Sequence, residues 1–307
     1  MKILTMVIML FVFMAGTPQE SKAFDKKKHG PITDNVSSVY NAYAGHHGLK
    51  PLDDEAMKAL ARGSVCEDAA TLTRANNWHF FDPNVGTKDE IKSEDTFFGT
   101  KNRSLHVRFN ALIDELQAAI QQGEKRRDIY KIIGRILHYI EDMGVPAHTI
   151  PIYHASPEWY LKPLFWLSGE EILPDGFDSF VAPVDLLAEK KFMNDIYSIT
   201  PSSGSDVKKQ MNAELTGLAN DTRKQVASDA RWGHFWSLQA ADPGRQGFKI
   251  YGEYGHLGFS DGEQGKCGGE LSQRCQEFYR NRMKAVVKTS VALLAYVQSK
   301  FGKQLEP

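Results

Sequence analysis

The sequence predicts an all-α protein built as a single multi-helix domain. Apolar residues recur at helical spacing through most of the 307 residues, which favours helices over strands. Glycine, proline and capping residues separate these stretches, and we find no internal repeat, low-complexity tract or clear linker. A chain of this length with 42% hydrophobic residues can bury a full core.

Helices are predicted over residues 32–48, 53–68, 105–120, 125–143, 206–231 and 270–301. Asp53 is a suitable N-cap for the second of these helices, and Gly123 is a suitable terminator for the third. Residues 175–203 are less regular because prolines interrupt them. Residues 232–269 are rich in glycine and aromatic residues, and we predict a long ordered loop there.

The helix over residues 125–143 is predicted to lie centrally. Ile129 and Ile133 begin an apolar row at helical spacing, and further isoleucines and leucines widen it. His138 and Asp142 fall on the opposite face. The polar edge of so apolar a helix is expected to line a cleft instead of open solvent.

Residues 1–23 are predicted to be a secretory signal peptide. A lysine precedes an apolar run over residues 3–15, and a small-x-small cleavage signal ends at Ala23. The apolar run is too short to span a bilayer. We therefore expect an exported, soluble product, periplasmic or extracellular, that begins at Phe24 and consists of one catalytic domain over residues 24–307.

Three cysteines remain after this cleavage, and export makes disulfide bonds possible. Cys267 and Cys275 bracket a glycine-rich loop, and a disulfide between them is favoured over two ordinary thiols. Cys66 lies two residues from Asp68, so a metal role is conceivable. A lone cysteine is more commonly a small buried hydrophobe, and we expect this for Cys66.

The stretch from His138 to His148 carries the first candidate site. His138 and Asp142 are four residues apart near the end of a helix, so both side chains leave the same face. Gly144 and Pro146 are expected to end the helix, and His148 to return from the turn. Two imidazoles and a carboxylate suit zinc. The alternative is a polar helix end with two ordinary histidines.

Other segments carry further candidate ligands. Asp68 ends a Gly-Ser-Val-Cys-Glu-Asp run, and His79 begins a His-Phe-Phe-Asp-Pro run. His154 and Glu158 form a second imidazole and carboxylate pair at a spacing of four, and His29 lies five residues after the expected new N-terminus. Together these are five histidines and three carboxylates, which suits a cluster of two or three ions.

Two of these motifs carry a resemblance to a known family. The His-x3-Asp-x5-His spacing, and the His-Phe-Phe-Asp-Pro run after a Gly-Ser-x-x-x-Asp run, resemble the zinc-dependent phospholipase C family. These trinuclear zinc enzymes are all-helical and share their fold with S1/P1 nucleases. The resemblance covers residues 24–158, and more loosely the last predicted helix.

The resemblance implies a complete ligand set. The residues it implies are Phe24, His29, Asp68, His79, His138, Asp142, His148, His154 and Glu158. Asp68, His79 and His138 would hold the first zinc, and Asp142 would bridge it to the third. Asp68 is also the candidate catalytic residue, and the sequence leaves open whether it serves as ligand, as general base or as both.

The resemblance also implies the ligands of the second and third zinc ions. His148, His154 and Glu158 would hold the second zinc. The third would take His29 together with the α-amino nitrogen and carbonyl oxygen of Phe24. Removal of the signal peptide would free that nitrogen, so export and activation would be one event.

The sequence departs from the family pattern in three places. The family usually begins its mature chain with Trp, and this chain has Phe24. The gap between His148 and His154 is shorter than in well-known members. In the best-known members, aromatic residues form a cage around choline, because the faces of aromatic rings bind cations. This chain has Ala69 and Asn76 at the matching positions. The sequence therefore leaves the headgroup unassigned.

The function implied by the resemblance is hydrolysis of phospholipids to diacylglycerol and a phosphorylated headgroup, by zinc-activated water at a membrane or micelle surface. We expect a monomer. An S1/P1-type nuclease for single-stranded nucleic acid is the first alternative, and the spacing of Phe24 and His29 favours it. The His-Phe-Phe-Asp-Pro run, Glu158 in place of an Asp, and the net charge of −1 speak against it. The second alternative is a non-catalytic, zinc-stabilised secreted protein that binds lipid or a partner.

Several other polar and aromatic residues are expected to have ordinary roles. Lys131 and Arg135 share the polar edge of the central helix and can attract phosphate, but solvated charges are the commoner outcome. The aromatic residues Trp232, Phe235 and Trp236 suit either a lipid interface or anchoring in the core. The histidines assigned to surface or packing roles are His46, His47, His106, His234 and His256.

Overall fold

The computed structural model describes residues 26–69, 81–85, 105–150, 185–201, 203–229, 232, 236–237, 253–254 and 271–305. Its helices are α2 (Lys26–His46), α3 (Asp54–Ala69), α5 (Leu105–Gln121), α6 (Arg126–Asp142), α7 (Pro146–Thr149), α10 (Lys190–Tyr197), α11 (Val207–Ser228), α13 (Leu271–Phe301) and the 3-10 helix η1 (Gly302–Leu305). The described strands, β1 (Trp236–Ser237) and β2 (Glu253–Tyr254), form one short antiparallel pair. The all-α prediction is confirmed.

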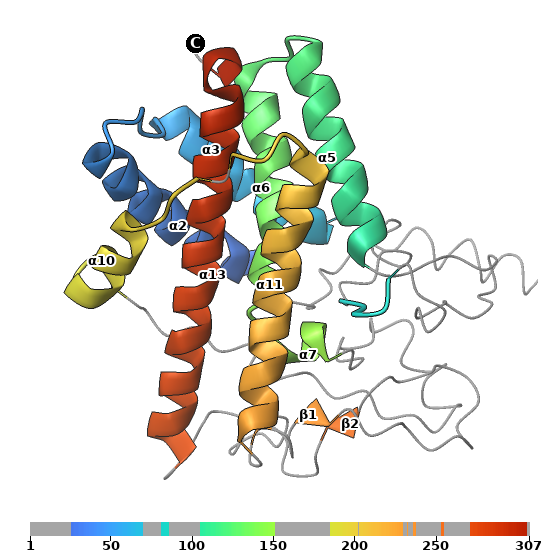
Figure 1. The fold of residues 1–307 in the computed structure, drawn as a ribbon, viewed down its shortest axis with the longest axis vertical. Coiled ribbons are helices and arrows are strands. Elements are labelled where there is room, and N and C mark those ends of the chain that lie inside the picture. Colours follow the sequence, from blue (N-terminus) through green and yellow to red (C-terminus); the bar gives the residue numbers. More distant parts are fainter. Residues whose placement is uncertain are drawn as a thin grey trace, which may run out of the picture.

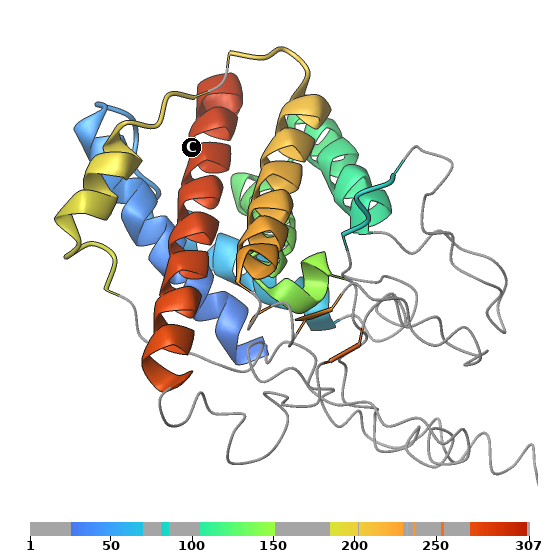
Figure 2. The same cartoon turned by 60° about the horizontal axis from the view of Figure 1, so that its bottom comes forward.

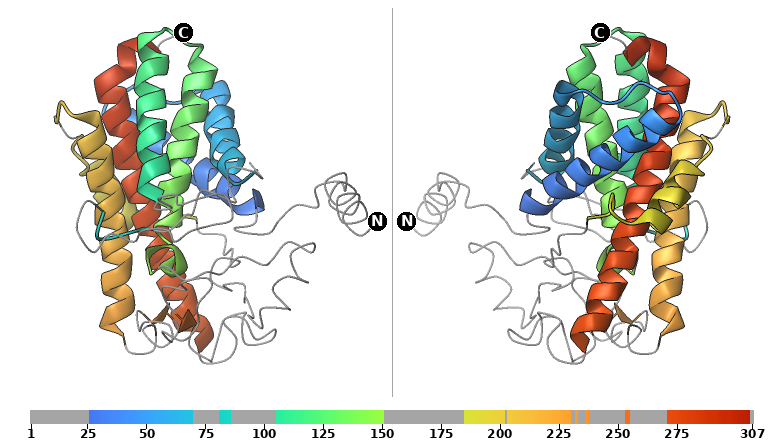
Figure 3. Two further views of the ribbon diagram at one scale, coloured as in Figure 1. Left: turned by 90° about the vertical axis from the view of Figure 1, so that its right-hand side faces the viewer. Right: turned by 90° about the vertical axis from the view of Figure 1, so that its left-hand side faces the viewer.

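Helix α6 lies at the centre of the described helices (Figure 1). It packs against α3 and α5 and also contacts α2, α11 and α13. In side view, α11 and α13 lie on one side of α6 and α3 lies on the other (Figure 3). Ile129, Ile133 and Ile136 are at most 1% exposed, because neighbouring helices cover the apolar row of α6. The central position predicted for this helix is confirmed.

Helices α3 and α6 meet at two glycines. A Cβ atom added to Gly63 would lie 2.1 Å from the backbone oxygen of Lys131, and one added to Gly134 would lie 2.1 Å from that of Leu60. Each glycine therefore allows a backbone-to-backbone approach that no larger residue permits. This contact brings the polar side chains of α3 within reach of α6.

Helices α11 and α13 run side by side, and α7 lies next to α11 (Figure 2). Thr222 of α11 donates its hydroxyl to the backbone oxygen of Met143, 2.6 Å away, in the turn after α6. Arg282 of α13 is 1% exposed and donates to Thr222 at 2.8 Å and to Asp221 at 2.6 Å. Burial lowers the pKa of Arg282, and Asp221 partly offsets this. The turn between α6 and α7 is thus held by two other helices.

Several predicted helix ends are confirmed. Asp53 caps α3 by accepting a hydrogen bond from the backbone nitrogen of Ala56 at 2.9 Å. Gly123 follows the end of α5 with a φ of +66°, the left-handed conformation that glycine adopts without strain. Asp206 caps α11 through the backbone nitrogen of Lys209 at 2.9 Å.

Other boundaries were predicted wrongly. Helix α2 begins at Lys26 instead of residue 32 and includes Pro31, which removes only one backbone hydrogen bond near the helix start. Buried contacts of His29 and Thr33 offset that loss. Helix α11 ends at Ser228 instead of residue 231.

Two segments expected to be irregular contain regular structure. Helix α10 lies within residues 175–203, and β1 and β2 lie within residues 232–269. Phe192, Met193 and Ile196 of α10 are buried, so packing stabilises a helix that local sequence signals do not predict. Among the described residues, no helix is both long and apolar enough to cross a bilayer.

The crossing of α3 and α6 predicts a large penalty for a side chain at Gly134. In Gly134→Ala the new Cβ would meet a backbone oxygen, which cannot rotate away, so we expect a loss of about 3 kcal/mol in unfolding free energy. The matched control is Gly217→Ala on α11, where nothing lies within 4 Å of the new Cβ. There alanine should stabilise the helix by about 0.5–1 kcal/mol. Urea denaturation measures both, and equal effects would contradict the close crossing.

Candidate metal centre

Three predicted ligands from two helices converge at the end of α6. His29 lies on α2, and His138 and Asp142 lie on α6. One ligand atom from each lies within 4.8 Å of the others, and all three side chains are fully buried. The rings of His29 and His138 have their centroids 4.0 Å apart. This group can hold a metal ion.

The distances in this group suit donors that share an ion. His138 Nε2 lies 3.5 Å from Asp142 Oδ2, and His29 Nε2 lies 3.7 Å from Asp142 Oδ1. Two ligands of one tetrahedral zinc, each about 2.0–2.1 Å from it, are about 3.4 Å apart. Asp142 directs Oδ1 toward His29 and Oδ2 toward His138. Two imidazoles and a carboxylate therefore fit zinc.

His148 lies beside this group. Its Nε2 is 3.9 Å from Asp142 Oδ1, and the residue is 5% exposed. As predicted, α6 ends before Gly144 and His148 returns from the turn, within the one-turn helix α7 that starts at Pro146. The backbone oxygen of His148 accepts from the backbone nitrogen of Phe81 at 2.8 Å. The described part of the His-Phe-Phe-Asp-Pro segment is thereby attached to α7.

Glu141 is a buried carboxylate that the sequence interpretation missed. It is fully buried and accepts from His29 Nδ1 at 2.5 Å, from Thr33 Oγ1 at 2.7 Å and from Ser64 Oγ at 2.8 Å. A signal was present in the sequence, because Glu141 continues the buried row of Ile133 and Leu137 at a spacing of four. A carboxylate in an apolar row requires a specific partner.

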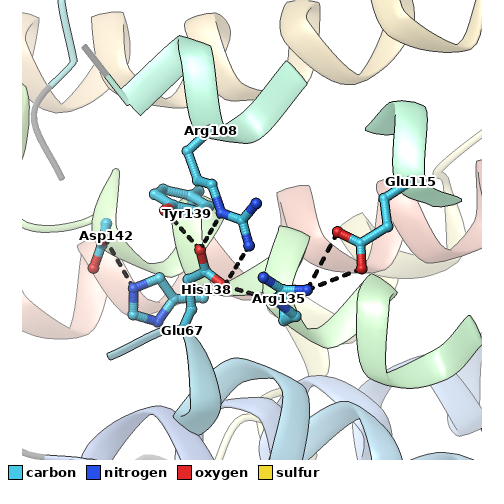
Figure 4. Close-up of polar contacts among 7 residues, drawn as sticks. All are labelled: Glu67, Arg108, Glu115, Arg135, His138, Tyr139 and Asp142. Carbon is cyan, nitrogen blue, oxygen red and sulfur yellow. Dashed lines mark hydrogen bonds and ion pairs between the residues drawn. The ribbon is translucent and has the colours of Figure 1, made fainter. Parts of the chain in front are cut away.

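A second buried carboxylate, Glu67 of α3, joins α3 to α5 and α6 (Figure 4). It accepts from Arg108 Nε and Arg135 Nε, both at 2.7 Å, and from the Tyr139 hydroxyl at 3.1 Å. Burial, and then the charge of Glu67, raise the pKa of Tyr139 well above its usual value. Figure 4 shows Arg135 also reaching Glu115, at 3.1 Å.

This network corrects one prediction. Arg135 is neither a phosphate-attracting group nor a solvated charge, because the carboxylates of Glu67 and Glu115 hold it between helices. Lys131 is exposed, as expected for a solvated charge. The difference arises because the side of α6 that carries Arg135 is covered by α3 and α5.

Cys66 also differs from its prediction. It is exposed, whereas we expected a small buried hydrophobe. The buried face of α3 runs through Leu60, Gly63, Ser64 and Glu67, and Cys66 lies outside that face.

The surface or packing roles predicted for His46, His47 and His106 are confirmed. His46 stacks on Tyr197, and His47 Nε2 lies 2.9 Å from the backbone oxygen of the same residue. His106 is buried against Phe81. Trp232 is 7% exposed and stacks on Phe278, which favours core anchoring over a lipid contact for this tryptophan.

The remaining predicted site residues are not described. Asp68 lies in α3 and Cys275 in α13, but their side chains lie outside the described part of the structure, as does the side chain of Trp236 in β1. The whole residues that lie outside it are Phe24, His79, His154, Glu158, His234, Phe235, His256 and Cys267, together with residues 1–23.

Comparison of the chain with protein-family models, characterised proteins and solved structures finds no match. The functional interpretation therefore depends on the donor group and on the motifs.

The converging donors predict that zinc stabilises the folded protein. With free zinc at 100 times its dissociation constant, the gain in unfolding free energy is about 2.7 kcal/mol, and a chelator should reverse it. His138→Gln should remove most of this gain. The control is His47→Gln, because His47 is exposed and contacts Tyr197 instead of the donor group. Denaturation with and without zinc measures the difference, and equal gains in the two variants would exclude His138 as a ligand.

Proposed function

We propose that this chain is an exported, zinc-dependent phosphodiesterase of the phospholipase C type. It would cleave phospholipids to diacylglycerol and a phosphorylated headgroup. The observation that carries this proposal is the buried group of His29, His138 and Asp142, whose ligand atoms lie within 4.8 Å of one another.

The ligand set that the resemblance implies favours a catalytic centre over a purely structural one, because catalytic zinc sites keep an open position that a structural site closes. Zinc, when bound, supplies Lewis-acid chemistry: it activates water as a nucleophile near neutral pH and offsets the charge of phosphodiester oxygens.

The residues of the chain have distinct roles in this proposal. By resemblance, His138 would hold the first zinc, His148 the second and His29 the third, and Asp142 would be shared by the first and the third. Asp68 would serve as a zinc ligand, as a general base or as both.

The choice of a phospholipid depends on the motifs. The His-x3-Asp-x5-His spacing is shared with S1/P1 nucleases, whereas the His-Phe-Phe-Asp-Pro run resembles the phospholipases. The hydrogen bond from Phe81 to the backbone oxygen of His148 supports a role for that run near the centre. Removal of residues 1–23 would add the amino group of Phe24 to the ligand set.

A paired hydrolysis assay tests the proposal. Protein that begins at Phe24 is incubated with mixed phospholipid micelles in one arm and single-stranded DNA in the other, each with and without a zinc chelator. We expect chelator-sensitive release of a phosphorylated headgroup. Loss of an outer-shell partner typically lowers activity by roughly 10–100-fold, and His138→Gln should lower it by more because a direct ligand is lost. His47→Gln should retain the wild-type activity.

Each other result points elsewhere. Chelator-sensitive cutting of DNA with intact lipid would replace the phospholipase by the nuclease. Inactivity of zinc-loaded protein in both arms would favour the non-catalytic binding protein. Lipid hydrolysis that resists the chelator would contradict the role of the metal.

A further inference from the structure

Glu141 gathers donors from two other helices at one buried carboxylate. Its Oε2 accepts from His29 Nδ1 of α2 and from Ser64 Oγ of α3, and its Oε1 accepts from Thr33 Oγ1 of α2. All four side chains are fully buried. Hydrogen bonds to an ionised acceptor are short and strong, and the 2.5 Å contact with His29 is the shortest of the three.

This contact determines which nitrogen of His29 faces Asp142. A carboxylate only accepts hydrogen bonds, so the proton of the neutral imidazole lies on Nδ1, next to Glu141. The lone pair of Nε2 then points toward Asp142, whose Oδ1 is 3.7 Å away. That is the tautomer in which His29 can bind a metal through Nε2.

We propose that Glu141 is a positioning residue that fixes the tautomer and ring orientation of His29 for zinc. The inference rests on the proposed zinc site but does not require the phospholipase activity. Glu141 acts through His29 and is itself no ligand in this arrangement. Thr33 and Ser64 hold the carboxylate in place, so the rotamer of Glu141 is also determined.

Two substitutions of graded severity test this role. Glu141→Gln keeps the shape and one neutral acceptor, whereas Glu141→Leu removes the acceptor and keeps a similar volume. Because outer-shell partners typically contribute 10–100-fold to metal affinity, we expect zinc affinity to fall by about that factor in Glu141→Leu and by less in Glu141→Gln. Competition with a chromophoric chelator measures the affinity.

The matched control is Glu67→Gln. Glu67 is also a buried glutamate with charge-assisted hydrogen bonds, but its partners are Arg108, Arg135 and Tyr139 instead of a ligand histidine. This variant should have a lower Tm and an unchanged zinc affinity.

A second readout needs no metal. In the zinc-free protein, nitrogen chemical shifts of the imidazoles report the tautomer of His29. The wild type should carry its proton on Nδ1, and Glu141→Leu should shift the proton toward Nε2. If Glu141 has only a structural role, its substitution would lower the Tm. The tautomer of His29 and the zinc affinity would then be the same in the variant as in the wild type.

The outcomes separate this inference from the proposed function. Weaker zinc binding together with a changed tautomer supports it. Unchanged affinity and tautomer in both Glu141 variants, or equal weakening in Glu67→Gln, overturns it while the proposed function stands if the wild type still binds zinc and cleaves lipid. A wild type that binds no zinc overturns both.

Discussion

The described structure depends on the burial of two neighbouring carboxylates at the C-terminal end of α6. Glu141 and Asp142 are both fully buried there, although the helix dipole makes that end unfavourable for negative charge. Buried charges require partners. The free-energy cost of leaving a buried charge unpaired is larger than the stabilisation that a surface ion pair provides. Imidazoles from α2, α6 and α7 surround Asp142, and donors from α2 and α3 surround Glu141. A bound cation is a natural complement to this concentration of carboxylates.

The packing of the helices explains how these donors arrive. Gly63 and Gly134 let α3 approach α6 closely enough for Ser64 to reach Glu141. On the other side, Thr222 holds the turn that follows α6, and the buried Arg282 holds Thr222. The turn carries α7, so the position of its histidine relative to Asp142 is determined by helices that come much later in the chain.

Local sequence patterns predicted the parts of the structure that local forces determine. The apolar row of α6, the cap at Asp53 and the spacing of His138 and Asp142 all follow from helical geometry. The partners of Glu141 and Arg135 do not, because they come from neighbouring helices; the helical row of α6 indicates only that Glu141 is buried. The approach of His29 was expected from the family resemblance alone, since no local pattern relates α2 to α6.

The carboxylates of Glu67 and Asp142, both buried beside α6, differ in how their charge is balanced. Glu67 is paired with Arg108 and Arg135, which remain charged under all ordinary conditions. Its cluster therefore needs no metal, and it holds α3 and α6 together independently of one. Asp142 has three imidazole partners, and an imidazole balances its charge only when protonated. This difference between the two carboxylates favours a metal centre that is already formed without an ion. Less of the free energy of metal binding would then be spent on folding than in small domains that fold only with their metal.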